Sequence, residues 1–325
     1  MSLTFVVSTG RCGSTLLSLI LREHRDVLSL SEFFSTVMRV SRAGGFPTAD
    51  MDGAELWRLL ATPDPLAGQL ARQAQASPVA ASSGPGYPFG TGRFTPDDLP
   101  PICQTVLPTL TDAPDALFDQ LAAEVPRWPR RPAAGQYRAL FALLSRLLGR
   151  PVIVERTGGL FPVLPLVHRE FPEARFVHLY RDGPDCALSM SQHPGFRVAA
   201  VNAEAARVAG LPPDATWKQI QANLPDQFKG LLTPPYDLHR LMTYPIPLTT
   251  FAHRWSDMIC HGLTALRQLP PGSWTSLRYE DLLHHPTTEL TRLAAFTGIP
   301  ALPGWLATAT RLVDPARAGR AATTL

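Results

Sequence analysis

The stretch LTFVVSTGRCGSTLLSLIL, residues 3–21, decides the fold of this chain. It begins with an apolar run at 3–7, whose β-branched and aromatic residues favour a buried strand. The turn that follows, at 8–13, holds two glycines, and the leucine-rich segment from Ser14 to Leu21 predicts a helix. A strand, a glycine-rich turn and a helix in this order bring several backbone N–H groups to one point.

The rest of the chain alternates short apolar strands with helices. We predict strands at 27–30, 152–155, 175–180 and 274–278, helices at 136–148, 184–192, 250–268 and 286–297, and an interrupted helical stretch at 160–171. This alternation predicts an α/β fold, in which a P-loop-type parallel sheet carries helices on both faces. The structure is expected to be a single domain, residues 1–325.

Two Pro-rich segments interrupt the alternation, at about 41–132 and 196–249. We expect them to be irregular insertions that form a lid or part of a substrate pocket. Within the first insertion, short helices are predicted at 55–60 and 116–124.

Composition places the chain among ordinary globular proteins. Hydrophobic residues make up 45% of its 325 residues, and the net charge is only +3, without a long Lys/Arg run, which argues against nucleic-acid binding. The four cysteines are scattered and lack metal-site spacing. No leader sequence begins the chain, and no apolar run approaches the roughly 20 residues that span a bilayer, so we expect a cytoplasmic protein.

The first glycine-rich turn predicts an anion site. Gly10 and Gly13 allow a tight turn, and the helix that follows adds unpaired N–H groups and the positive end of its dipole. A Walker A loop would carry Lys before Ser14, whereas Arg11 is the loop's cation here. We also find no apolar strand that ends in an Asp for magnesium. This departure weakens a kinase or nucleotide hydrolase interpretation, which stays an alternative.

A second segment, residues 174–190, predicts another anion site. Its strand ends at Arg181, Pro184 suits the first position of a helix, and Ser189 follows on that helix. Arg181 and Ser189 can therefore converge on one anion near the helix start, because Arg offers a planar fork that matches phosphate oxygens. In the alternative, Arg181 ends a strand and Ser189 is an ordinary helix residue.

Both segments resemble motifs of sulfotransferases that use 3′-phosphoadenosine-5′-phosphosulfate (PAPS), in the bacterial, glycan and tyrosyl branches. GRCGSTLL, residues 10–17, resembles their 5′-phosphosulfate loop P-R-S-G-S/T-T-L, with Gly10 in place of Pro and Cys12 in place of Ser. Residues 175–189 resemble the 3′-phosphate motif, an apolar strand followed by R-D-P-x-D-x-x-x-S, with Gly183 in place of Pro.

The resemblance implies the residues that bind PAPS. The 5′-phosphosulfate would be bound by Gly10, Arg11, Cys12, Gly13, Ser14 and Thr15, and the 3′-phosphate by Arg181 and Ser189. RYEDLLHHP, residues 278–286, resembles R-Y-E-D-L-x-x-x-P, in which the Tyr lies against the nucleotide. Tyr279 inherits that role by implication, and a packed aromatic at a strand end is its alternative.

Catalytic residues also follow from the resemblance. A Glu at about the place of Glu32 is the base in the tyrosyl and bacterial glycolipid branches, and His193 is our second candidate. A solvated Glu at a helix start is the alternative for Glu32. Arg156 stands where related enzymes carry a Lys that stabilises the transferring group, although Glu155 beside it can instead form a salt bridge. Arg11 and Arg156 are expected to hold the sulfuryl group.

Together these expectations describe a sulfotransferase that moves a sulfuryl group from PAPS to a hydroxyl and releases adenosine 3′,5′-bisphosphate (PAP). The acceptor would be a small molecule, a glycolipid, a natural-product alcohol or a carrier-bound hydroxyacyl chain, and no metal is required. Besides the kinase or hydrolase, the alternative is a relative that binds the nucleotide without catalysing transfer.

Overall fold

The computed structural model describes residues 2–41, 46–76, 84–212, 215–233, 237–319 and 321–322. Parts of both expected insertions, at 42–45, 77–83, 213–214 and 234–236, lie outside the described residues.

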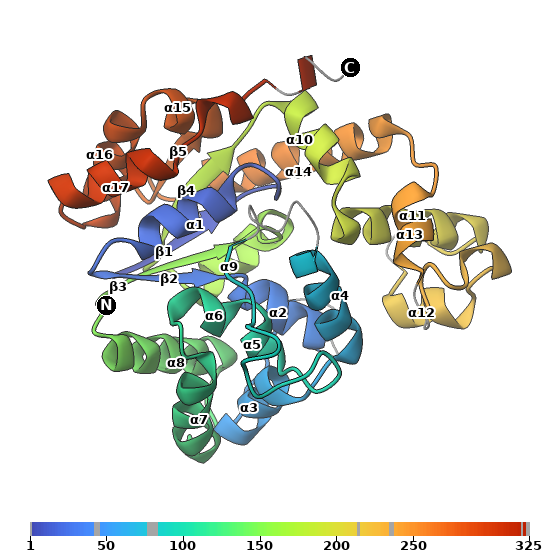
Figure 1. Ribbon diagram of the computed structural model, residues 1–325, viewed down its shortest axis with the longest axis horizontal. Helices are drawn as coiled ribbons and strands as arrows, with labels where there is room; N and C mark the ends of the chain where they lie inside the picture. The colour runs from blue at the N-terminus through green and yellow to red at the C-terminus, as the bar shows by residue number, and fades with distance from the viewer. Residues whose placement is uncertain are drawn as a thin grey trace.

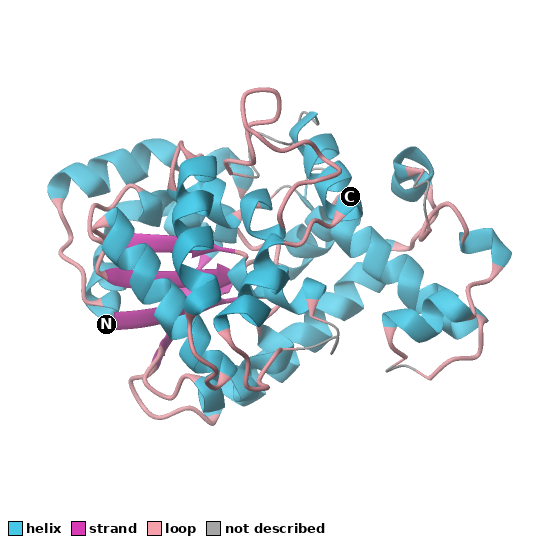
Figure 2. Ribbon diagram, turned by 90° about the horizontal axis from the view of Figure 1, so that it is seen from below, coloured by secondary structure: helices cyan, strands magenta, loops and turns pink. Residues whose placement is uncertain are grey.

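One parallel sheet forms the centre of the molecule (Figure 1). Its strands are β1 (Ser2–Val7), β2 (Val27–Ser31), β3 (Val152–Thr157), β4 (Arg175–Tyr180) and β5 (Trp274–Arg278), in the order β2-β3-β1-β4-β5. All five predicted strands are confirmed, and helices surround the sheet on both faces (Figure 2). The predicted α/β fold class is therefore correct.

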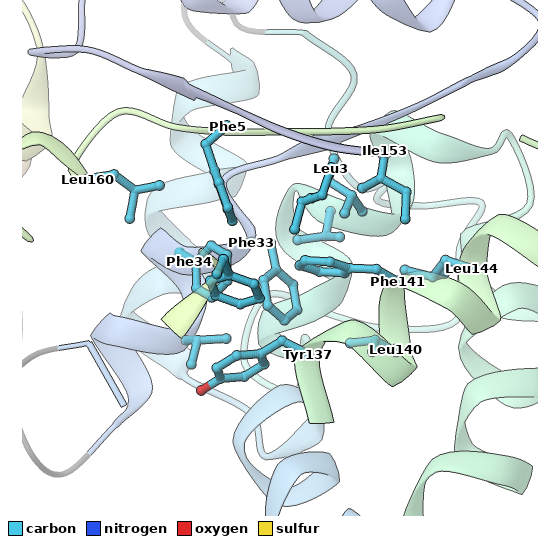
Figure 3. Packing of buried hydrophobic residues seen from close by; sticks show 14 of the residues in the cluster. Leu3, Phe5, Phe33, Phe34, Tyr137, Leu140, Phe141, Leu144, Ile153 and Leu160 are labelled. Atoms are coloured by element: carbon cyan, nitrogen blue, oxygen red, sulfur yellow. The ribbon is translucent and has the colours of Figure 1, made fainter. Parts of the chain in front are cut away.

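The first face of the sheet packs on an aromatic cluster (Figure 3). Side chains alternate along a strand, so Phe5 points to this face while Val6 points to the other. The Phe5 ring lies 5.9 Å from that of Phe34, which in turn lies 5.3 Å from Tyr137. Helices α2 (Phe33–Val40), α8 (Ala133–Leu148) and α9 (Leu164–Glu170) contribute to this layer.

The second face is covered by helices from the two ends of the chain. They are α1 (Ser14–Arg22), α15 (Tyr279–His284), α16 (Pro286–Thr297) and α17 (Pro303–Leu312). The indole N–H of Trp305 donates to the carbonyl of Ile20 over 2.8 Å, which joins α17 to α1. The C-terminal helices thereby pack against α1, the helix that follows the glycine-rich loop.

The first insertion contributes buried residues to the core of the molecule. Its helices are α3 (Gly53–Ala61), α4 (Pro65–Ala76), α5 (Pro101–Gln104), α6 (Val106–Leu110) and α7 (Pro114–Glu124), so both predicted short helices are confirmed. Leu56, Ile102 and Leu117 are buried in the same cluster as Phe5. This segment therefore contributes to the stability of the sheet layer.

The second insertion combines helices with irregular connecting segments. It holds α11 (Pro194–Val208), α12 (Trp217–Ala222) and α13 (Leu238–Thr243), which share a small hydrophobic cluster of their own. Pro194 occupies the first turn of α11, a position where a missing N–H costs nothing, so it starts a helix instead of breaking one. Figures 1 and 2 show these helices to one side of the sheet.

Two further helices connect this part to the sheet. α10 (Gly183–Ser191) follows β4, and α14 (Leu248–Arg267) packs along it. Short 3₁₀ turns occur at Val125–Arg127, Phe161–Val163, Asp226–Phe228 and Pro315–Arg317. None of the helices in the described ranges combines the length and the apolar character needed to cross a membrane.

Replacing Phe34 by Ala should destabilise the protein by about 3–5 kcal/mol, because a fully buried ring leaves a cavity in the aromatic cluster. Urea denaturation measures the free energy of unfolding. The control is Trp217→Ala, since Trp217 is 47% exposed and its loss should change that energy by about 0.5 kcal/mol or less. Equal effects of the two substitutions would contradict this description of the core.

Candidate active site

A cavity of about 430 Å³ opens at the carboxyl edge of the sheet. Because β1 lies between β3 and β4, the loops after these three parallel strands meet at this edge. Seven residues predicted from the sequence line the cavity: Gly10, Arg11, Ser14, Thr15, Glu32, Arg156 and His193. The tertiary structure therefore brings together side chains that are far apart in the chain.

The glycine-rich loop adopts an unusual backbone. Gly10 and Gly13 have φ angles of 75° and 87°, and Arg11 between them has φ 59°. Among the described residues only Arg11 and Glu32 are non-glycine residues with positive φ, and both line the cavity. Such conformations are costly for L-residues and persist where the surrounding structure imposes them. α1 then begins without a side-chain cap, which leaves its first N–H groups for a ligand.

Cys12 and Tyr279 are buried on the side of the loop that faces the protein interior. Cys12 is fully buried, and burial raises the pKa of its thiol, so it is not placed to replace a serine hydroxyl toward a phosphate. Tyr279 is 4% exposed, and a Cβ on Gly13 would lie 2.0 Å from its ring. Neither residue is among those that line the cavity. Both side chains pack at the loop, and their contact with the nucleotide stays a prediction.

Glu32 and Arg156 form an ion pair at the cavity wall. The guanidinium of Arg156 donates to Glu32, to the hydroxyl of Ser31 and, over 3.0 Å, to the hydroxyl of Ser18. Ser35 donates to the second oxygen of Glu32. The ion pair with Arg156 and the hydrogen bond from Ser35 therefore hold the Glu32 carboxylate in one orientation.

The aromatic side chains next to Glu32 do not surround its carboxylate. Phe33 and Phe34 point into the core cluster (Figure 3). Arg156 and Ser35 therefore form the surroundings of the carboxylate, whose side chain is 28% exposed.

Glu155 is completely buried beside this pair. Burial raises its pKa to about 8, although Thr157 donates to its carboxyl over 2.6 Å. In the described part of the chain it forms no ion pair, so the alternative of a Glu155 salt bridge is excluded there. Glu155 is thus mostly protonated at neutral pH and adds little negative charge beneath the site.

Arg181 and Ser189 lie next to the glycine-rich loop. Arg11 donates through Nε to the hydroxyl of Ser189 over 3.2 Å, and Arg181 approaches the carbonyl of Arg11 at 3.5 Å. The ring of Tyr279 lies 4.9 Å below the guanidinium of Arg181. The Nε of Arg181 is buried without a hydrogen-bond partner, so this donor is available to a bound oxyanion. The two predicted anion sites are therefore neighbours.

Asp185 fastens the end of the chain to Arg181. Its carboxylate accepts from Arg181 over 2.7 Å and from the backbone amides of Gly319 and Ala321 over 3.0 and 2.7 Å. Arg181 also donates to the carbonyl of Arg317. The sequence analysis did not find this C-terminal contribution, because the partners are backbone groups that carry no residue signature.

His193 is arranged as a hydrogen-bond donor toward the cavity. Its Nδ1 accepts from the amide of Gly195 over 3.2 Å, which places the proton of the neutral ring on Nε2. Burial, together with the charge of Arg11, lowers its pKa to about 4. The ring is then neutral at physiological pH, and its Nε2–H is a hydrogen-bond donor.

Arg254, Phe196 and Met258 also line the cavity, and the sequence analysis missed all three. They come from α11 and α14, where no local motif marks them. Phe196 packs on the loop, since a Cβ at Gly10 would lie 2.9 Å from its ring. Among the described residues, no group of three or more His, Cys, Asp or Glu side chains is placed to hold a metal.

No protein-family model and no curated protein matches the chain. The sulfotransferase domain from the curacin biosynthetic pathway matches with 16% identity and a TM-score of 0.48, over 100% of this chain and 82% of that one. The sulfotransferase domain of the Synechococcus PCC 7002 olefin synthase matches with 16% identity and a TM-score of 0.49, over 99% and 88%.

A sulfotransferase from Alicyclobacillus acidocaldarius matches with 12% identity and a TM-score of 0.39, over 98% of this chain and 96% of that one. All of these neighbours are sulfotransferases. The chain is similar to them over almost its whole length.

Replacing Asp185 by Asn should cost about 2 kcal/mol of stability at pH 7, because the carboxylate loses its charge-assisted hydrogen bonds. Burial alone would raise the pKa of Asp185, but the hydrogen bonds from Ala321 and Arg181 outweigh it and lower the pKa. The stabilisation is therefore present above the unfolded pKa of about 3.9 and is lost as pH falls through the folded value.

Urea denaturation of the wild type and Asp185→Asn between pH 7 and pH 3 measures this difference. The difference in the free energy of unfolding between the two proteins should decrease only toward pH 3. A gap that stays constant down to pH 3 would show that ionised Asp185 does not stabilise the C-terminal segment.

Proposed function

We propose that this protein is a sulfotransferase that transfers a sulfuryl group from PAPS to a hydroxyl of an acceptor and releases PAP. The observation that carries the proposal is the contact between the two anion sites, in which Arg11 reaches Ser189 and Arg181 approaches the loop carbonyl. A nucleotide with phosphates at both its 5′ and 3′ positions needs two such sites within the length of one adenosine.

The glycine-rich loop suits the 5′ end of PAPS. The uncapped first turn of α1 and the hydroxyls of Ser14 and Thr15 face the cavity and can donate to phosphate oxygens. The left-handed residues Gly10, Arg11 and Gly13 curve the backbone around that point. Glycine at these two positions leaves room for the rings of Phe196 and Tyr279, which pack against the loop.

Arg181 and Ser189 suit the 3′-phosphate. The unpartnered Nε of Arg181 is the kind of buried donor that an oxyanion satisfies, and Asp185 holds the guanidinium in place. The 3′-phosphate is the group that distinguishes PAPS from ATP, so this site accounts for donor choice.

Transfer requires the acceptor hydroxyl to lose its proton as its oxygen bonds to sulfur and the bond from sulfur to the phosphate oxygen breaks. Glu32 takes that proton in this proposal, because Arg156 and Ser35 hold its carboxylate at the cavity wall. Arg156 uses three of its five N–H groups on Ser18, Ser31 and Glu32, and the others remain for the sulfuryl oxygens. PAPS itself supplies the sulfuryl group and a good leaving group.

Positive charge around the cavity stabilises the dispersed negative charge of the transferring group. Arg11 lies at the junction of the two anion sites, and burial lowers its pKa without removing its proton at neutral pH. His193 adds an N–H donor from the start of α11. The acceptor in this proposal is a hydroxyl on a small molecule, a glycolipid or a natural product.

Replacing Arg181 by Ala should weaken PAP binding by about ten- to a hundredfold, since charge-assisted hydrogen bonds contribute about 1.5–3 kcal/mol. Isothermal titration measures this, and AMP serves as the comparison ligand because it lacks the 3′-phosphate. AMP affinity should change little. Arg207→Ala, on the exposed surface of α11, is the control variant. Equal losses for PAP and AMP would place the 3′-phosphate elsewhere.

Replacing Glu32 by Gln should leave PAP affinity unchanged and lower kcat about a hundredfold or more, because the proton acceptor is removed. Transfer of labelled sulfuryl from PAPS to an acceptor panel measures kcat. His193→Gln should keep most of the activity, since His193 acts as a donor. If His193→Gln abolishes turnover while Glu32→Gln does not, the base is His193.

A further inference from the structure

We propose that Arg254 binds an anionic group of the acceptor, so that the substrate is a hydroxy acid or a hydroxyalkyl or hydroxyaryl phosphate. This inference rests on the proposed function, because it assigns the part of the cavity that the donor does not use. It names the chemistry of the acceptor, a carboxylate or phosphoryl oxyanion on the same molecule as the reacting hydroxyl.

Arg254 lies on the α14 side of the cavity. It projects from the first half of that helix, and Met258, one turn later on the same helix, also lines the cavity. The guanidinium lies 5.8 Å from the centre of the Phe196 ring, and Phe196 packs against Gly10 of the loop. The Phe196 ring therefore lies between Arg254 and the glycine-rich loop.

The three arginines of the cavity differ in how they are engaged. Arg11 donates to Ser189, and Arg156 is bound to Glu32 and two serines. Arg254 has neither an ion pair nor a hydrogen bond with any described residue, and its contact with Phe196 is a cation–π interaction. It is the cavity arginine whose N–H groups are all available within the described structure.

One cation of the cavity is not used by the donor in the proposed function. Three guanidinium groups and one carboxylate, Glu32, line it. In the proposed function the donor phosphates bind at the loop and at Arg181, and the transferring group lies near Arg11 and Arg156. Arg254 then remains as a partly desolvated cation, and an oxyanion is the ligand that its planar fork matches.

The residues around Arg254 indicate the chemistry of the rest of the acceptor molecule. Phe196 and Met258 offer apolar surface on the same wall, whereas Glu32 and Ser35 are polar. A molecule with a hydroxyl at one end, an apolar middle and an anion at the other end fits this sequence of surfaces. A neutral alcohol of the same shape would leave the guanidinium without a partner.

The test uses the full chain saturated with PAP and two matched pairs of probes. The first pair is 4-hydroxybenzoate and 4-hydroxybenzamide, and the second is 3-hydroxyoctanoate and its methyl ester. 4-Hydroxyphenyl phosphate is the phosphoryl arm. Isothermal titration should give at least about tenfold tighter binding for each anionic probe than for the neutral probe of the same pair. A charge-assisted hydrogen bond typically changes affinity by about tenfold or more.

Replacing Arg254 by Gln should remove the preference for the anion, and Arg254→Lys should keep part of it. Arg267→Gln is the matched control, because it removes the same charge from the exposed last turn of α14. The preference should survive in that variant. Comparison of the two anionic arms decides between a carboxylate and a phosphoryl group.

Three results would overturn the inference. They are equal binding of anionic and neutral probes to the wild type, no binding of any probe, and a preference that persists in Arg254→Gln. A selective loss of PAPS affinity relative to PAP in Arg254→Gln, with the probe preference intact, would assign Arg254 to the sulfuryl group instead. Failure of the wild type to bind PAP at all would refute the proposed function itself, so the two failures are distinguishable.

Discussion

The packing of Tyr279 beneath Gly13 is the constraint on which the whole site depends. The ring occupies the space where any side chain at position 13 would lie, and Gly13 adopts a left-handed conformation there. The same ring lies under the guanidinium of Arg181. One aromatic side chain, at the start of α15 directly after β5, therefore packs between the two predicted anion sites, which follow β1 and β4.

The arginines in and beside the cavity differ in their hydrogen-bond and ion-pair partners. These partners hold three of the guanidinium groups in fixed positions. Arg181 is fixed by Asp185 and by backbone carbonyls, Arg156 by Glu32 and two serines, and Arg11 by Ser189. Fixed cations need little reorganisation when charge develops, which is the condition for electrostatic stabilisation of a transition state. Arg254 alone of the cavity arginines is left for a ligand within the described structure.

The two insertions differ in what they contribute. The first packs its helices against the aromatic cluster under the sheet and gives Thr105 to the cavity. The second follows His193, whose side chain caps α11, and it brings Phe196 against the loop. The prolines that made both segments look irregular are compatible with helices, because many of them stand in first turns where no N–H is needed.

The sequence by itself determined the five strands, the parallel α/β class and the loop residues Gly10 to Thr15, because these depend on local apolar runs and on glycine positions. It also marked Glu32, Arg156, Arg181 and Ser189 as candidate site residues through their motifs. The structure places Glu32 and Arg156 on the cavity and Arg181 and Ser189 next to Arg11 of the loop. Only the tertiary structure decided that Tyr279 and Cys12 lie beneath the loop, that Glu32 is ion-paired, and that Arg254 reaches the cavity. Those facts depend on which helix faces pack together, and no short stretch of sequence encodes a contact between segments that are hundreds of residues apart.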